Sequence, residues 1–206
     1  TTSVVQVSKP SDSEYGTVEI DIQGGYIYSL KNGALAVDGD VSYESQVHIS
    51  GGVLKSDCTT TSVGIYAIDV DNATDRLWVD GGTIIGRSKE AVHSNCTETI
   101  ISGGTFYSRA YTVYRQDGDV LQLTGGKFIC GADGKESYSA QDNVIQIGSN
   151  ADEIVISGNP VVQGCSPDQP TFRDVRNNVR SIAGGTFSRK PDSGYIVESY
   201  AAYAAP

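Results

Sequence analysis

A pair of glycines recurs along this chain, each time directly after a short stretch in which apolar and polar residues alternate. Seven such units can be aligned on their first glycine, namely Gly24, Gly51, Gly81, Gly103, Gly125, Gly158 and Gly184. Successive first glycines are separated by 27, 30, 22, 22, 33 and 26 residues. A unit that recurs at such a period predicts a solenoid, in which each copy stacks on the one before it.

Two apolar columns appear when the units are aligned. Two residues before the first glycine, all seven residues are aliphatic: Ile22, Ile49, Val79, Ile101, Leu123, Ile156 and Ile182. Three residues after it, all seven are apolar: Ile27, Leu54, Ile84, Phe106, Phe128, Val161 and Phe187. Alternation with a period of two indicates strands on both sides of the glycines, and glycine reaches positive φ at a sharp corner without steric cost. We therefore predict that both columns face the core.

The sixth unit departs from this pattern. Asn159 replaces the second glycine, and Pro160 follows it in a column that otherwise contains no proline. Because proline cannot donate a hydrogen bond to a strand ladder, we expect a local irregularity at this corner.

A second apolar stretch follows in most units, after a loop of variable length. Such stretches include 34–37, 65–70, 111–114 and 144–147, and most of them end in an Asp or Asn turn. Three short strands per unit predict an all-β fold, a single-stranded parallel β-helix of about seven coils. Left-handed β-helices keep a strict six-residue rhythm, which these variable units lack, and parallel crossovers are generally right-handed. We therefore predict the right-handed form.

We predict a single domain over residues 1–206. The coils occupy residues 17–187, with an N-terminal cap at 1–16 and a closing segment at 188–206, because an open coil would expose backbone pairing edges. The chain begins Thr1-Thr2 without a methionine. We therefore expect that it follows a removed leader or forms part of a longer surface protein.

Charge and hydropathy limit the partners that this chain can have. Its 15 Lys and Arg residues against 25 Asp and Glu residues give a formal net charge of −10. No basic stripe of the kind found in nucleic-acid binders is visible, and an anionic membrane surface would repel the chain. No apolar run approaches the roughly 18 residues of a membrane span. We expect neither nucleic-acid binding nor membrane insertion.

Two motifs carry a resemblance to a known family. The repeat Ile101-Ser102-Gly103-Gly104-Thr105-Phe106 and the run at 184–191, Gly-Gly-Thr-Phe-Ser-Arg-Lys-Pro, resemble the extracellular repeat proteins of gut Firmicutes. Those are large secreted or cell-wall-attached chains with pectate-lyase-like β-helix regions. The resemblance covers nearly the whole chain and implies an extracellular bacterial protein. It carries no catalytic motif, so it implies an adhesin or structural scaffold that contacts glycans or host surface proteins.

A carbohydrate-active enzyme, either a polysaccharide lyase or a glycoside hydrolase, is the alternative. Pectin hydrolases of this fold are similar to one another in Asn-Thr-Asp, Asp-Asp and Gly-His-Gly motifs, which this sequence lacks. Glycoside hydrolysis normally needs two carboxylates, and Asp69 with Asp71, or Asp38 with Asp40, has a suitable spacing. These aspartates, however, lie in or beside Asx turns, where they serve backbone geometry. His48 lies between two inward positions and is expected to be a solvated surface residue. We predict no catalytic residue.

An acidic run is the one candidate metal site. Asp69, Asp71 and Asp75, together with Asn72, place four oxygen-bearing side chains within seven residues. Calcium takes six to eight oxygen ligands, and the run lacks the glycine and the final glutamate of a calcium loop. A calcium site at the three aspartates is therefore weighed against a solvated acidic loop, and no other cofactor is expected.

Aromatic residues form the candidate ligand-binding set. Trp78, Tyr28 and Tyr107 occupy outward-facing strand positions in the alignment, and Tyr111 and Tyr114 lie on another strand. Exposed aromatic rings on a rigid β surface can stack on sugar rings, because they combine apolar area with a polar tip. The alternative is a ladder of rings that only stabilises the helix.

The four cysteines show no spacing typical of a zinc site. Cys130 and Cys165 follow their glycines at similar distances in adjacent coils, which favours a disulfide between them over one between Cys58 and Cys96. Buried thiols are the alternative, since unpaired cysteine is common in protein cores.

Three hypotheses follow for the function. Smooth faces lined by serine and threonine, such as the column Ser50, Ser102, Thr124 and Ser157, would favour a scaffold or adhesin. A flat aromatic patch would favour a glycan-binding module. A long concave face with clustered carboxylates and basic residues would favour an enzyme.

Overall fold

The computed structural model describes residues 3–8, 16–38, 44–58, 66–87, 90–109, 111–131, 143–174 and 181–197. Within these ranges the chain consists of β-strands and one short 3-10 helix (Ser193–Tyr195). Every strand pairing is parallel. Among the described residues, no helix has the length and apolar character needed to cross a bilayer.

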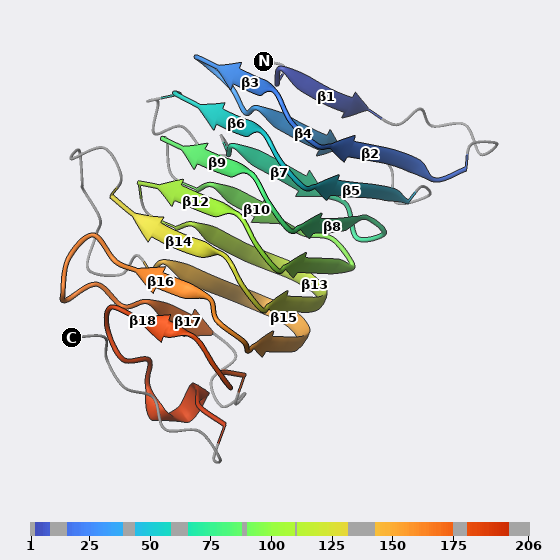
Figure 1. Ribbon diagram of the computed structural model, residues 1–206. Coiled ribbons are helices and arrows are strands. Elements are labelled where there is room, and N and C mark those ends of the chain that lie inside the picture. The colour runs from blue at the N-terminus through green and yellow to red at the C-terminus, as the bar shows by residue number, and fades with distance from the viewer. Residues whose placement is uncertain are drawn as a thin grey trace.

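The strands form three faces, each of which takes one strand from almost every coil (Figure 1). Face one contains β2 (Val18–Ile22), β5 (Ser45–Ile49), β8 (Arg76–Val79), β11 (Glu98–Ile101) and the second halves of β13 (Val113–Leu123) and β15 (Ile145–Ile156). Face two contains β3 (Tyr26–Ser29), β6 (Val53–Ser56), β9 (Thr83–Gly86), β12 (Thr105–Ser108), β14 (Lys127–Cys130), β16 (Val161–Gln163) and β18 (Thr186–Phe187). Face three contains β1 (Val5–Ser8), β4 (Leu35–Asp38), β7 (Ile68–Asp71), β10 (Val92–Ser94), the first halves of β13 and β15, and β17 (Phe172–Asp174).

The chain visits faces one, two and three in turn and then moves one strand along the rod. Face two holds seven strands in the order β18-β16-β14-β12-β9-β6-β3, so the described residues make seven coils. In Figure 1 the near strands run to the left and the far strands to the right as the chain descends from N to C, which is the right-handed sense. The predicted right-handed parallel β-helix of about seven coils is confirmed.

The two predicted columns form most of the core. All seven residues of the column before the glycines are buried. In the column after them, Ile27 of the first coil is partly buried, and five of the remaining six residues are fully enclosed. Phe106 and Phe128 stack in register, with ring centroids 4.9 Å apart and an interplanar angle of 11°. Burial of each such side chain contributes on the order of 1.5–3 kcal/mol.

The sixth coil corrects one residue of the prediction. Phe128 pairs with Val162, which is buried, whereas Val161 is only partly buried. Pro160 adds one residue between the glycine and the strand, and the positive φ of this corner, 68°, falls at Gly158. The irregularity expected at Pro160 is therefore present. Assigning Val161 to the core was wrong, because one extra residue turns each following side chain to the opposite side of a strand.

Faces three and one are joined in two coils by an unbroken strand. β13 bends through this corner with a register shift between Arg115 and Asp117. The Arg115 side chain is fully buried, and its guanidinium donates to Ser94 Oγ (3.4 Å), Thr99 Oγ1 (3.2 Å) and the carbonyl of Thr97 (3.4 Å). Burial lowers the pKa of Arg115. These bonds tie the bend in β13 to the preceding coil.

The two ends of the rod differ. At the C-terminal end, Ile196 bridges Ile182 in parallel, and the Tyr195 ring packs edge-on against Phe172 with centroids 5.1 Å apart. At the N-terminal end, β1 pairs with β4 on face three. Of the predicted cap and closing segment, residues 1–2, 9–15 and 198–206 lie outside the described residues.

The Cys130–Cys165 disulfide, which the spacing favoured over Cys58–Cys96, is not formed. All four cysteines are thiols, the alternative that the sequence left open. Cys130 and Cys165 are instead connected through the amide of Gln169. Its Nε2 donates to Cys130 Sγ (3.3 Å), and its Oε1 accepts from the backbone N–H of Cys165 (2.6 Å).

Candidate functional site

The five aromatic residues predicted to bind glycans lie on three different faces. Trp78 lies on β8 of face one. Tyr28 on β3 and Tyr107 on β12 share face two, but three coils separate them. Tyr111 and Tyr114 lie beside and within the part of β13 that belongs to face three. The structure therefore does not gather them into one surface.

A groove of about 390 Å³ opens on face one, across β2, β5 and β8. It is lined by Glu19, Ile20, Asp21, Gln46, His48 and Trp78, and is called the Trp78 groove below. Asp21, His48 and Trp78 are in register on neighbouring strands. Since neighbouring strands lie about 4.8 Å apart, these three side chains form one outward column along the rod.

Hydrogen bonds fix the side chains of this groove. The indole N–H of Trp78 donates to Glu98 Oε1 at 2.7 Å. His48 Nε2 lies 3.1 Å from Asp80 Oδ2, and His48 Nδ1 lies 3.7 Å from Asp21 Oδ1. The carboxylates of Asp21 and Asp80 therefore flank the imidazole, and both remain about half exposed.

The Trp78 groove combines one large ring with several hydrogen-bonding groups. An indole face offers apolar area on which a flat ring can stack. The carboxylates of Glu19 and Asp21 accept hydrogen bonds, and the amide of Gln46 both donates and accepts. A ligand that carries many hydroxyl groups around an apolar ring face fits this arrangement.

Face three carries a second cluster, in which His93 lies among tyrosine rings. The His93 and Tyr66 rings stack with centroids 4.2 Å apart, and the Tyr114 ring lies 5.6 Å from His93 on a tilted plane. Tyr111 stacks on Tyr114 at 5.7 Å. His93 Nδ1 lies 2.8 Å from Asp69 Oδ1. Two of the tyrosines predicted to bind glycans, Tyr111 and Tyr114, thus pack against each other, and Tyr114 also packs against His93.

The electrostatics of this second cluster follow from burial and from its acidic neighbours. Burial lowers the pKa of His93, but the hydrogen bond and charge of Asp69, with the charge of Asp71, outweigh it and raise the pKa above 6.5. Burial raises the pKa of Asp69, and His93 offsets this only in part. Burial and the charge of Glu90 raise the pKa of Tyr66. Because His93 is only 4% exposed, its ring has little access to a ligand.

The three aspartates predicted to hold calcium have different surroundings. Asp69 pairs with the imidazole of His93. Asp71 Oδ1 accepts a hydrogen bond from Asn95 Nδ2 at 2.7 Å. Asp75 is buried, and its Oδ1 accepts the backbone N–H of Ser45 at 2.7 Å. Within the described ranges, no group of three or more His, Cys, Asp or Glu side chains is arranged to hold a metal ion. The acidic run does not form one ligand set, because Asp75 faces the core while Asp69 and Asp71 face outward.

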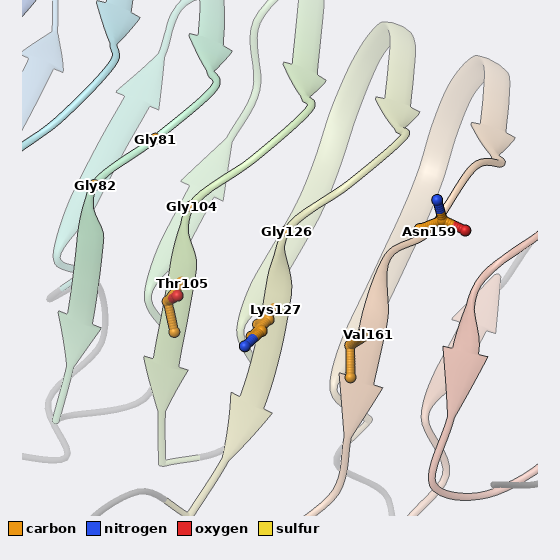
Figure 2. Close-up of a pocket in the computed structure, with 8 residues that line it drawn as sticks. All are labelled: Gly81, Gly82, Gly104, Thr105, Gly126, Lys127, Asn159 and Val161. Carbon is orange, nitrogen blue, oxygen red and sulfur yellow. The ribbon is translucent and has the colours of Figure 1, made fainter.

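A second hollow, of about 360 Å³, follows the glycine corners between faces one and two (Figure 2). It is lined by Gly81, Gly82, Gly104, Thr105, Gly126, Lys127, Asn159 and Val161. Figure 2 shows these corners side by side in successive coils, with the side chains of Thr105, Lys127, Asn159 and Val161 on the strands and turns that follow the glycines. The hollow follows from the need for glycine at each corner, and its lining contains no aromatic ring.

Sequence reasoning selected Trp78 but missed the side chains around it. Asp21, His48 and Trp78 each stand three residues before the first glycine of their unit. The alignment therefore contained the column, and only the meaning of its outward side chains was overlooked. No comparable signal pointed to the Asp69–His93 pair, because loops of unequal length separate the face-three strands from the glycines.

The in-register stacking of parallel strands on three faces makes this chain a parallel β-helix protein. Comparison with known proteins identifies nothing beyond that class, because no protein-family model, no curated protein and no solved structure matches the chain. The resemblance to extracellular repeat proteins therefore rests on the Gly-Gly-Thr-Phe motifs alone.

Proposed function

We propose that this chain is an extracellular module of a bacterial surface protein, in which a rigid β-helix acts as a scaffold or adhesin and binds glycans in the Trp78 groove. The resemblance of its repeats to those of secreted and cell-wall-attached proteins supports the location and the bacterial source. Seven coils at the usual strand spacing make a rod about 34 Å long. A stiff rod with a binding surface on its side suits a role in display and attachment.

One observation carries the glycan proposal. Trp78 lines the groove with its indole N–H fixed on Glu98, so the ring is held in place before a ligand arrives. Binding to a preorganised surface avoids the cost of ordering side chains. Glu19, Asp21 and Gln46 line the same groove on the two neighbouring strands, β2 and β5. They can bond to hydroxyl groups of a sugar chain that extends along the groove from the ring.

A glycan array with the purified chain tests this function. We expect binding to a restricted set of glycans, weakened by about tenfold or more in Trp78→Ala, since a ring at the centre of a site often carries much of the binding energy. Trp78→Phe should retain part of the binding. Tyr107→Ala, on face two, is the matched control and should bind as the wild type does.

Two outcomes would contradict the proposal. Glycan binding that survives Trp78→Ala would place the site on another face. An array without any hit would remove sugar recognition and leave the scaffold role alone.

A further inference from the structure

The charge of the Trp78 groove restricts the sugars that it can take, an inference that rests on the proposed function. Glu19 and Asp21 line the groove directly. Asp80 contacts the imidazole of His48, and Glu98 contacts the indole of Trp78. Four carboxylates therefore lie in or next to the groove. Glu19 and Asp21 are on β2, two strands away from Trp78, and Asp80 and Glu98 contact the His48 and Trp78 side chains.

Little positive charge offsets them among the described residues of face one. Arg76 lies on β8 next to Trp78, but its Nε forms an ion pair with Glu44 Oε1 at 3.0 Å. The nearest other group that can be cationic is His48, which lies between Asp21 and Asp80. At neutral pH the groove is strongly negative, and its charges are partly exposed.

We infer that the groove binds sugars that carry a free amino group and rejects sugars that carry a carboxylate. An ammonium group near Asp21 and Glu19 gains charge-assisted hydrogen bonds, which are about twice as strong as neutral ones. A uronic or sialic acid would instead bring a carboxylate close to Glu19 and Asp21, and like charges across an interface are strongly unfavourable. Neutral sugars should bind with an affinity between those of the amino sugars and the acidic sugars.

Calorimetric titration of the full chain in EDTA compares three oligosaccharides of equal length. These are oligomers of glucosamine, N-acetylglucosamine and galacturonic acid. We expect glucosamine oligomers to bind about tenfold more tightly than the acetylated ones, and galacturonic acid oligomers not to bind. The preference should shrink as salt is added, because the charges are partly exposed.

Two variants test the role of the carboxylates while preserving their shape. Glu19→Gln and Asp21→Asn should each weaken glucosamine binding by a larger factor than N-acetylglucosamine binding, because only the ammonium group of glucosamine loses a charge-assisted hydrogen bond. Glu153→Gln is the matched control, since Glu153 is exposed on the same face but two coils beyond Glu98. It should change neither affinity.

The outcomes separate this inference from the proposed function. Equal binding of glucosamine and its acetylated form, if abolished by Trp78→Ala, would overturn the charge preference and leave glycan binding standing. Binding of galacturonic acid oligomers that is lost in Trp78→Ala, whether in EDTA or after calcium is added, would also overturn the charge preference and leave glycan binding standing. If none of the three binds and the array is also blank, both proposals fail.

Discussion

The first and second glycine of a typical unit serve different physical purposes. At Gly103, the first of its pair, a Cβ atom would overlap the carbonyl oxygen of Asp80 in the preceding coil. Gly104, the second, has φ of 87°, which L side chains rarely adopt. The first glycine therefore allows coils to approach closely, and the second allows the chain to turn. Gly24 occupies the first position in the first coil, and its Cβ would meet nothing within 4 Å.

This difference predicts unequal costs for one substitution. Gly103→Ala should lower the free energy of unfolding by about 1–3 kcal/mol or more, because overpacking forces the backbone to shift. Gly24→Ala should leave it within about 0.5 kcal/mol of the wild type. Urea unfolding followed by circular dichroism measures both, and equal losses at the two sites would contradict the close-approach explanation.

The Asp69–His93 pair predicts a pH dependence of stability. The pKa of His93 is raised in the folded chain, so its contribution is complete below the unfolded pKa of about 6.5 and is lost as pH rises through the folded pKa. The stability difference between wild type and His93→Gln should therefore fall as pH rises from about 6.5 through the raised pKa of His93 in the folded chain. The midpoints of urea unfolding of both chains, measured at each pH, give this difference. The contributions of titrating groups that the two chains share cancel in it.

The partner of His93 supplies the control. Asp69→Asn removes the negative charge that raises the pKa of His93, so the pH-dependent part of the difference should shrink in that background. A difference that rises with pH would show that burial, rather than the carboxylate, dominates the imidazole.

Strand register is decided at the level of the element, and the sixth coil shows how. Val162 occupies the core column in line with Phe128, while Val161 is turned away. Val162→Ala should cost about 2 kcal/mol, since it leaves a cavity beside the phenylalanines. Val161→Ala should cost less than about 1 kcal/mol. Thermal or urea unfolding measures both losses. A larger loss for Val161→Ala than for Val162→Ala would mean that Val161 is the core residue, as the glycine alignment predicted.

The bend of β13 depends on one buried cation. Arg115→Ala should destabilise the chain by roughly 2–5 kcal/mol, because it leaves a cavity and removes the donor from Ser94 and Thr99. Arg115→Met should cost less, since it restores most of the volume and no longer buries a charge. Denaturant midpoints of both variants test this, and a harmless Arg115→Ala would mean that the bend does not need the guanidinium.

The whole molecule behaves as a one-dimensional stack, in which each coil contacts chiefly its neighbours. Residues 104–125 are one coil of 22 residues, the spacing from Gly103 to Gly125. Deleting them should leave a folded β-helix of lower stability, because the glycine corners and core columns stay aligned. Deleting only 104–122 should prevent cooperative folding, since the columns lose register. Circular dichroism and urea titration distinguish the two, and equal behaviour would contradict the stacking model.

The arrangement of one coil can be read from local sequence signals. Recurring glycine pairs and two apolar columns are local, periodic signals, so they were sufficient to predict seven coils, three strands per coil, parallel pairing and most of the core. The misplacement of Val161 arose because Pro160 inserts one residue into a pattern that alignment on the glycine treats as constant.

Which side chains meet across coils depends on how the coils stack, and this is known only from the three-dimensional structure. Asp69 contacts His93 of the next coil, and Gln169 links Cys130 to Cys165. Loops of unequal length separate these residues from the glycine corners, so their register along the rod cannot be counted from the sequence. The Trp78 groove is the intermediate case. Its column was present in the alignment, but the groove itself forms only when β2, β5 and β8, from three successive coils, lie side by side.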